Sequence, residues 1–297
     1  MTKNNPIGSV SAIWIFPVKS MQGYQIEQGE FTERGLVGDR AYALIDQETG
    51  KVISAKSVRL FPELFQCHAK FIDTPQAEGQ LPPVQITLAN GKTVTSDAKD
   101  IDQVLSGFFG RSVTLAQAAP DDFTIDQYHP DIEGAAPHGQ RDTVAEQKLG
   151  SAFFAEAGIP SPVAAGSFLD LFPVSVLTSS TLQKLGQLQP DSIFDECRFR
   201  MNIIIDTKNT GFVENSWVGQ ALALGDSLRL QVAMPDPRCV MTTLAQGELL
   251  RDNEVLRTLV QHNRIQVGDS GQFPCAGVYV VVQTPGLLQT GDKVVVG

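Results

Sequence analysis

The sequence predicts a mixed α+β fold that is rich in β-strands and built from barrels or sandwiches. Three observations lead to this prediction: short apolar or alternating runs recur along the chain, glycine-containing turns separate most of them, and helical spacing of apolar residues is confined to a few segments. With 297 residues, 42% of them hydrophobic, the chain can bury a large core and is long enough for two domains.

The N-terminal third begins with short strands. Apolar segments predict strands over residues 9–16, 41–46 and 51–54. The last two are joined by the sequence Asp-Gln-Glu-Thr-Gly at 46–50, which favours a turn.

A hairpin and a helix follow. The Asn-Gly dipeptide at 90–91 stands between the alternating segments 84–88 and 92–95, a pattern typical of a tight β-hairpin. Residues 100–110 then have apolar side chains three or four positions apart, and this spacing predicts a short helix.

The middle of the chain is expected to connect two domains. Proline and glycine are frequent between residues 116 and 166, so we expect little regular structure there. The sequence therefore predicts a first domain over residues 1–120, a linker or crossover over 121–145 and a second domain over 146–297.

The second domain is again expected to be rich in strands. A Thr-Ser-Ser cap signal predicts a helix over residues 180–188, and an apolar face predicts another over 248–262. Strands are predicted over residues 201–205, 228–232 and 278–283.

Composition excludes several classes of protein. The net charge of −10 and pI near 4.9 argue against a nucleic-acid-binding protein, because such proteins need a cationic surface. No apolar run approaches the roughly 18 residues of a membrane span, and the N-terminus lacks the apolar core of a secretory signal. We therefore expect a cytoplasmic protein without a membrane partner.

Common site motifs are absent. The four cysteines are widely separated and form no C-x-x-C pair, so neither a disulfide framework nor a zinc knuckle is indicated. The four histidines lack ligand spacing and are expected to lie in exposed loops. No nucleotide-binding glycine motif or hydrolase elbow occurs, and pyridoxal phosphate is not expected.

One thiol is the candidate chemical centre. Cys239 lies in Met-Pro-Asp-Pro-Arg-Cys-Val-Met-Thr-Thr (234–243), where two prolines stiffen the chain and Arg238 precedes the thiol. A neighbouring cation favours the thiolate, which is the form that acts as a nucleophile or metal ligand. The alternative is an inert thiol, because free cysteine is more often packed as a small hydrophobe.

A second segment indicates an anion site. In Arg-Phe-Arg-Met-Asn-Ile-Ile-Ile-Asp (198–206), alternation places Arg198, Arg200 and Asn202 on one face of a predicted strand that enters the core. Buried arginines need an anion, because an unpaired buried charge is costly. Phosphate matches the planar guanidinium fork and is the expected ligand.

Six motifs together resemble a known family. They are Pro-Val-Lys-Ser (17–20), Gly-Asp-Arg (38–40), Arg-Phe-Arg-x-Asn (198–202), Glu-Asn-Ser-Trp-Val-Gly (214–219), Pro-Arg-Cys-Val-x-Thr-Thr (237–243) and Gly-Asp-Lys-Val (291–294). In this order and spacing the chain is similar to MOSC proteins with a MOSC N-terminal β-barrel domain. That subgroup includes the bacterial YcbX-like proteins and the mitochondrial amidoxime-reducing component.

The resemblance implies a fold and a cofactor site. The first domain is then a MOSC N-terminal β-barrel domain, and the second is a MOSC β-barrel domain with peripheral helices. Cys239 is implied as a ligand of molybdenum in a molybdenum cofactor (Mo-molybdopterin). The positions implied to hold that cofactor are Lys19, Ser20, Arg40, Asp170, Arg200 and Asn202.

Each of these positions has a structural alternative. Lys19 and Ser20 can begin a solvated loop, and Arg40 can form a surface ion pair with the preceding aspartate. Asp170 can cap a turn before a strand, and Arg198 can be a supporting salt-bridge partner. Within the family motif, Arg200 ranks above Arg198 as a cofactor contact.

The resemblance also implies a reaction, the two-electron reduction of N-hydroxylated compounds such as hydroxylamines, amidoximes or N-hydroxylated bases. The cysteine pattern of a [2Fe–2S] domain is absent, so we expect electrons from a separate ferredoxin or flavoprotein reductase. The alternatives are a sulfur carrier that holds a persulfide on Cys239 and a protein that binds the cofactor without turnover. Two positions depart from the family pattern, since Met201 replaces a frequent proline and Asp236 a frequent second cysteine.

Overall fold

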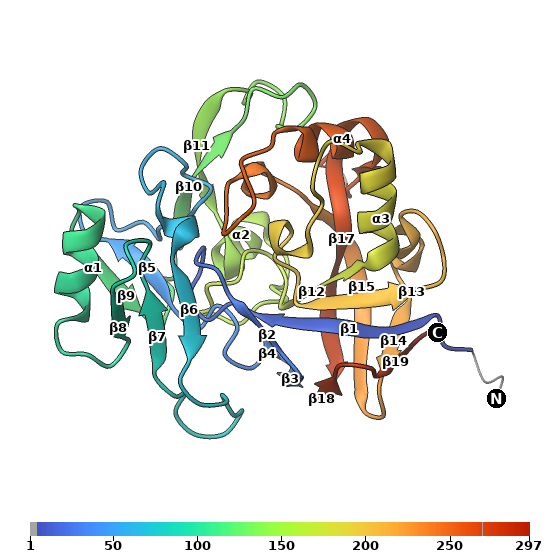
Figure 1. Ribbon diagram of the computed structural model, residues 1–297, viewed down its shortest axis with the longest axis horizontal. Helices are drawn as coiled ribbons and strands as arrows, with labels where there is room; N and C mark the ends of the chain where they lie inside the picture. The colour runs from blue at the N-terminus through green and yellow to red at the C-terminus, as the bar shows by residue number, and fades with distance from the viewer. Residues whose placement is uncertain (1–4, 269) are drawn as a thin grey trace.

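A closed barrel is the centre of the computed structural model (Figure 1). Within residues 5–268 and 270–297, which the structure describes, seven strands form the ring, and it closes because β17 pairs with β12. In ring order the strands are β12 (Val174–Thr178), β13 (Ile203–Thr207), β1 (Gly8–Ile15), β19 (Lys293–Val296), β14 (Ala221–Leu224), β15 (Leu228–Pro237) and β17 (Gln272–Thr284).

The barrel joins the two ends of the chain. β1 pairs antiparallel with β13, with Ile13 opposite Ile203, and also with β19, with Gly8 opposite Val294. Figure 1 accordingly shows the N-terminal strand crossing the barrel built by the C-terminal half. The first strand of the chain thus belongs to the same sheet as the last one.

Smaller sheets lie beside the barrel. They are β18–β3–β4, β5–β9, β6–β7–β8 and the hairpin β10–β11, while β2 and β16 extend the barrel sheet. Their strands are β2 (Tyr24–Ile26), β3 (Gln28–Thr32), β4 (Gly35–Leu36), β5 (Ala43–Asp46), β6 (His68–Phe71), β7 (Val84–Thr87), β8 (Thr93–Thr95), β9 (Val113–Ala116), β10 (Thr124–His129), β11 (Thr143–Lys148), β16 (Arg264–Gln266) and β18 (Gly286–Gln289).

The helices lie at the periphery, and local signals set their ends. α3 begins where the Thr178 side chain accepts a hydrogen bond from the Thr181 amide. α1 stops at Gly110, which adopts the left-handed conformation that favours glycine. The bounds are α1 (Ile101–Phe109), α2 (Gly150–Ala157), α3 (Ser179–Leu188) and α4 (Glu254–His262), with 3₁₀ turns at η1 (Leu64–Gln66), η2 (Glu196–Arg198), η3 (Val213–Trp217) and η4 (Val240–Thr243).

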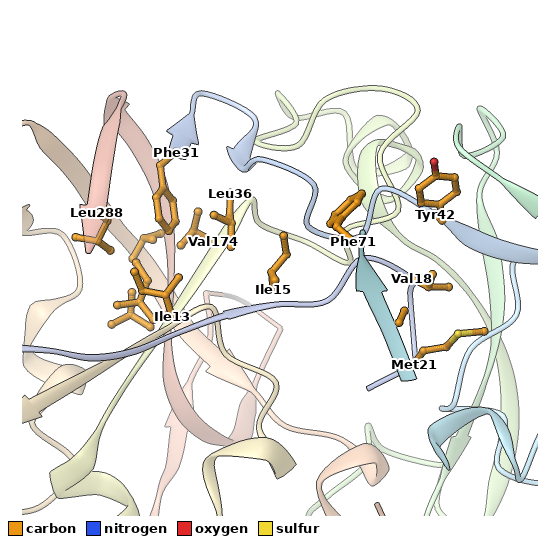
Figure 2. Packing of buried hydrophobic residues seen from close by; sticks show 14 of the residues in the cluster. Ile13, Ile15, Val18, Met21, Phe31, Leu36, Tyr42, Phe71, Val174 and Leu288 are labelled. Atoms are coloured by element: carbon orange, nitrogen blue, oxygen red, sulfur yellow. The ribbon is translucent and has the colours of Figure 1, made fainter. Parts of the chain in front are cut away.

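One hydrophobic cluster runs through both halves of the molecule. Side chains of the barrel and of the N-terminal sheets belong to the same contiguous set of buried residues. Figure 2 shows part of it, including Ile13, Val174, Leu288, Val18, Tyr42 and Phe71. The N-terminal sheets are therefore anchored to the barrel by shared apolar burial, which also holds the loops between them in place.

The predicted fold class is confirmed: the protein is β-rich, with a closed barrel and peripheral helices. The strands predicted over 9–16 and 41–46 are β1 and β5, and the predicted hairpin is β7–β8. The helices predicted over 100–110 and 180–188 are α1 and α3.

Two predicted elements are wrong. Residues 51–54 form one isolated bridge, between Val52 and Ile45, and not a strand. The backbone hydrogen bonds of this segment go to two different partners, since Ile53 donates to the Leu44 carbonyl oxygen and Val52 donates to that of Thr124. The helix predicted from 248 begins only at Glu254, because residues 246 and 249 form a tight two-way hydrogen-bonded turn.

The expectation of sparse structure between 116 and 166 is also wrong. β10, β11 and α2 all lie there. In β10 the side chains of Ile125, Gln127 and His129 are buried in alternation, so the strand signal was present but proline and glycine content obscured it. The burial of His129 also corrects the expectation that the histidines lie in exposed loops. The domain limits at 120 and 145 remain a prediction.

We expect Gly277→Ala to lower the free energy of unfolding by about 1–3 kcal/mol or more through overpacking. Gly277 in β17 has φ 80°, and a Cβ atom there would meet Met201 Cε at 2.2 Å and the Val176 carbonyl oxygen at 2.5 Å. Gly139→Ala is the matched control, since Gly139 also has φ 80° but no neighbour within 4 Å. Urea unfolding measures both, and equal losses would contradict the steric argument.

Candidate functional site

Segments far apart in the sequence meet beside the barrel. The loop after β1 carries Lys19 and Ser20, and the Lys19 ammonium pairs with Asp170 in the loop before β12. The Arg40 guanidinium donates to the carbonyl oxygen of Arg200 at 3.0 Å. Asn202 is buried and donates to Asp39, the carboxylate that pairs with Arg40. The structure thus brings together all six positions that were predicted to hold a cofactor.

Asp170 lies between two lysines. One carboxylate oxygen pairs with Lys19, and the other pairs with Lys56 at 2.7 Å. Burial alone would raise the pKa of Asp170, but the two ammonium charges hold it well below its usual range. Lys56 was not predicted from the sequence, because a lone lysine in Ser-Ala-Lys-Ser resembles an ordinary surface residue.

Lys19 is a buried cation, and its one carboxylate partner, Asp170, offsets only part of the cost of burying its charge. Its side chain is 6% exposed and also donates to the Phe168 carbonyl oxygen at 2.8 Å. Burial lowers the pKa of Lys19 to about 8; Asp170 opposes this, whereas the nearby charges of Lys56 and Arg40 add to it. A further anion beside Lys19 would therefore stabilise its charged ammonium form.

Two arginines pack against one aromatic ring. The guanidinium carbons of Arg200 and Arg40 lie 4.3 Å and 4.4 Å from the ring centroid of Phe16. Arg200 also donates to the Met21 carbonyl oxygen at 2.8 Å. Burial, with the nearby charge of Arg40 adding to it, lowers the pKa of Arg200 to about 9. The Phe16 ring thus keeps two positive guanidinium groups close together, and this arrangement favours binding of an anion.

Asn202 and Asp39 connect the barrel to this cluster. The Asn202 amide donates to Asp39 at 2.9 Å, and its carbonyl oxygen accepts from the Ser175 amide at 3.1 Å. Asp39 also pairs with Arg40 and accepts from the Phe16 amide at 2.9 Å. The Asp39–Arg40 ion pair therefore exists, but it is buried and not on the surface.

Cys239 lies at the edge of the same cluster, just beyond the end of β15, and begins the short turn η4. Its thiol is half-buried and interacts electrostatically with Lys56 and Arg238. Arg238 turns back to pair with Asp236 and donates to the Phe199 carbonyl oxygen. The predicted cation beside the thiol is therefore joined by a second one.

The other three cysteines lie in less favourable surroundings for a thiolate. Burial raises the pKa of Cys67 to about 11 and the pKa values of Cys197 and Cys275 to about 12, with nearby carboxylates adding to each shift. Cys67 and Cys275 are fully buried. Of the four thiols, Cys239 is the one that interacts with both Lys56 and Arg238.

The cluster as a whole has an excess of positive charge. Five cations, Lys19, Lys56, Arg40, Arg200 and Arg238, face three carboxylates, Asp39, Asp170 and Asp236. This excess stands in a chain with a net charge of −10. A local positive region in an acidic protein is suited to a small anionic ligand.

Backbone strain is concentrated at the same place. In the described part of the chain, four residues other than glycine have positive φ, and three of them are Ser20 (66°), Arg40 (47°) and Arg200 (54°). Such conformations cost roughly 1–3 kcal/mol each and persist at sites where the surroundings impose them. The strain supports a ligand-binding role for these three residues.

Family models match most of the chain. The MOSC N-terminal beta barrel domain matches residues 7–112, and the MOSC domain matches residues 165–295. The chain belongs to the MOSC family. The resemblance drawn from the six motifs is thereby confirmed.

Relatives of this MOSC protein are distant but extend over its length. It is 23% identical to mitochondrial amidoxime-reducing component 1 of Homo sapiens, over 97% of this chain and 82% of that protein. It is 25% identical to a molybdenum cofactor sulfurase of Oryza sativa subsp. japonica, over 86% of this chain and 31% of that protein. The structure of the YUAD protein of Bacillus subtilis aligns over 97% and 94% of the two chains at 9% identity and a TM-score of 0.43, too low to carry an argument.

The prediction that Arg198, Arg200 and Asn202 lie on one face of a strand within residues 198–206 is wrong, and the strand predicted over 201–205 begins two residues later. Arg198 ends the 3₁₀ turn η2, Arg200 is left-handed, and strand β13 begins only at Ile203. Arg198 points away from the cluster, and its guanidinium donates to the carbonyl oxygens of Ile193, Thr242, Leu244 and Leu250. Arg198 is buried and connects these loops through its hydrogen bonds, and it forms no salt bridge with a described residue.

Proposed function

We propose that this MOSC protein is a molybdenum-cofactor-dependent reductase of N-hydroxylated compounds, which include hydroxylamines, amidoximes and N-hydroxylated bases. The observation that carries the proposal is the buried excess of positive charge next to the half-exposed thiol of Cys239. A phosphate-bearing cofactor with a thiophilic metal requires both features.

The residues of the site fit such a cofactor. The pKa values of Lys19 and Arg200 are lowered by burial and by neighbouring cations, so an anion would relieve the repulsion. The Nε atom of Arg238 is buried and has no hydrogen-bond partner among the described residues. A buried donor without a partner is costly, and a polar ligand would satisfy it.

The proposed roles follow from the chemistry of each side chain. Arg40, Arg200 and Lys19 bind phosphate, and Asn202 and Asp170 orient polar groups of the ligand. Ser20 holds the loop that carries Lys19, since its hydroxyl accepts from the Ala55 amide at 3.0 Å. The Cys239 thiolate is the protein ligand of molybdenum, with Lys56 and Arg238 stabilising its negative charge. When bound, the cofactor supplies two-electron redox chemistry.

The relatives support the choice of reaction. Mitochondrial amidoxime-reducing components from several mammals match 97% of this chain, and their name states the reduction of an N-hydroxylated group. We include in the proposal a separate ferredoxin or flavoprotein reductase as the electron donor. No helix in the described residues is long and apolar enough to cross a membrane. The relatives are mitochondrial by name, so the expected cytoplasmic location remains a prediction.

A second candidate is a sulfur carrier with a persulfide on Cys239. It is favoured by the likeness to a molybdenum cofactor sulfurase, although this chain spans 31% of that protein. Two cations beside the thiol would stabilise a persulfide anion as well as a thiolate. A third reading, cofactor binding without turnover, shares the same site.

The test is to purify the protein from a host that makes the cofactor and to measure molybdenum, pterin and reductase activity. We expect molybdenum and pterin in equal amounts and reduction of an aromatic amidoxime by a reduced viologen dye. Cofactor without turnover would favour the binding role. Protein free of molybdenum that carries sulfur releasable by cyanide would favour the sulfur carrier and overturn the proposed reaction.

A further inference from the structure

Asp236 is a buried carboxylate whose hydrogen-bonding capacity is only partly used. It lies near the end of β15 with 1% of its surface exposed. Its Oδ2 atom pairs with the guanidinium of Arg238. Its Oδ1 atom is buried and has no hydrogen-bond partner among the described residues. A buried polar oxygen without a partner is rare and calls for a functional explanation.

The groups around Asp236 define its electrostatics. Arg238 directly follows β15, and Tyr279 and Cys275 come from β17. Asp170 and Lys56 of the cation cluster also act on its charge. Burial raises the pKa of Asp236 to about 6, against the opposing influence of Arg238, Tyr279 and Lys56. An acid in this range can hold a proton and release it near neutral pH.

Tyr279 contacts both Asp236 and the loop that carries Asp170. Its hydroxyl interacts with the Asp236 carboxylate, and its ring stacks on Phe172 with centroids 5.2 Å apart. Phe172 lies two residues after Asp170, and both rings are half-buried. Asp236 thus interacts both with the cation cluster and with a partly exposed tyrosine that itself lies near Asp170.

We propose that Asp236 supplies a proton to the leaving oxygen of the N-hydroxylated substrate, with its free Oδ1 atom as the place where that proton is held. This rests on the proposed function. A hydroxylamine takes up two electrons and two protons as its N–O bond breaks, giving an amine and water. The electrons come from the external redox protein. One proton comes from Asp236 and the other from solvent, and Asp236 is then reprotonated from solvent past Tyr279.

Kinetics of the holoenzyme test the proposal through the Asp236→Asn variant, which keeps the shape but cannot donate the proton. We expect kcat for an aromatic amidoxime to fall roughly 10²- to 10⁴-fold with KM little changed, the usual loss for a general acid. In the wild type, kcat should decrease as pH rises through about 6, because Asp236 ionises, and this decrease should be absent in the variant. Asp236→Glu should retain part of the rate and the pH dependence.

Glu214→Gln is the matched control. Glu214 is also a buried carboxylate whose pKa is raised by burial, but both its oxygens accept hydrogen bonds, from Thr178 at 2.7 Å and Thr181 at 2.6 Å. It lies in η3, where it contacts the start of α3, and it is outside the cation cluster. We expect Glu214→Gln to lose stability while its kcat keeps the wild-type pH profile.

Infrared spectroscopy gives a readout that does not depend on turnover. In the wild-type holoenzyme a carbonyl band of a protonated carboxyl group should disappear as pH rises through about 6, and Asp236→Asn should lack this band. If the wild type does not reduce N-hydroxylated compounds, the proposed function fails. If it does, but Asp236→Asn keeps the wild-type kcat and pH profile, or the band survives in that variant, the assignment of Asp236 alone is overturned.

Discussion

The Cys239→Ser variant is expected to fold normally and to lose reductase activity to the background level. The thiol is half-exposed at the start of η4, so the smaller hydroxyl leaves the core unchanged. A hydroxyl is a far poorer ligand for molybdenum than a thiolate. Circular dichroism and thermal unfolding should match the wild type, whereas turnover of an amidoxime should vanish.

Cys67 and Cys197 provide the controls for this variant. Both lie where burial raises the pKa of the thiol, and Cys67 is fully buried. Their serine variants should lose stability, as expected for core substitutions, while the folded fraction keeps its activity. Amidoxime reduction retained by Cys239→Ser, or lost in a fully folded Cys67→Ser protein, would show that the wrong thiol was assigned.

The Arg200→Ala variant is expected to bind the cofactor roughly 10- to 150-fold more weakly, because a charge-assisted hydrogen bond contributes about 1.5–3 kcal/mol. Molybdenum and pterin occupancy should fall together. Arg200→Lys should recover only part of the loss, since an ammonium keeps the charge but not the planar fork. Metal analysis and pterin fluorescence of the purified variants measure this.

A purely structural role for Arg200 makes a different prediction. In that case the alanine variant would melt earlier in the cofactor-free form and yet bind the cofactor normally once folded. Arg198→Ala is the comparison, because its guanidinium donates to four carbonyl oxygens between loops and it lies outside the cluster. We expect Arg198→Ala to lose stability in the cofactor-free form and Arg200→Ala to lose occupancy.

The affinity for the anion should also depend on pH. The pKa of Lys19 in the folded protein is lowered to about 8, so its ammonium form is lost as pH rises through that value. Because phosphate binds the ammonium form, cofactor affinity in the wild type should decrease above about pH 8. In the cofactor-free protein the sign is opposite: the unfolded chain binds more protons than the folded chain between about pH 8 and 10.5, so this group raises stability with pH there.

Local elements of the fold were predictable because their signals act over a few residues. The Asn-Gly turn at 90–91 sets the β7–β8 hairpin, and the Thr178 hydroxyl caps α3. The α4 helix began later than predicted, because Leu250 matched the helical spacing although it is 81% exposed. Apolar spacing therefore located the elements but not all of their ends.

The sequence alone determined the family and the β-rich class, since these depend on residue type and order along the chain. It also predicts Cys239 as the reactive thiol and the residues that bind an anion beside it, and that assignment remains a prediction. The tertiary structure alone decided that β1 lies between β13 and β19 in the barrel, and that Lys56 shares Asp170 with Lys19. It also separated Arg198 from Arg200, which alternation had placed on one face. All of these outcomes depend on contacts between separate segments of the chain, and local periodicity contains no information about such contacts.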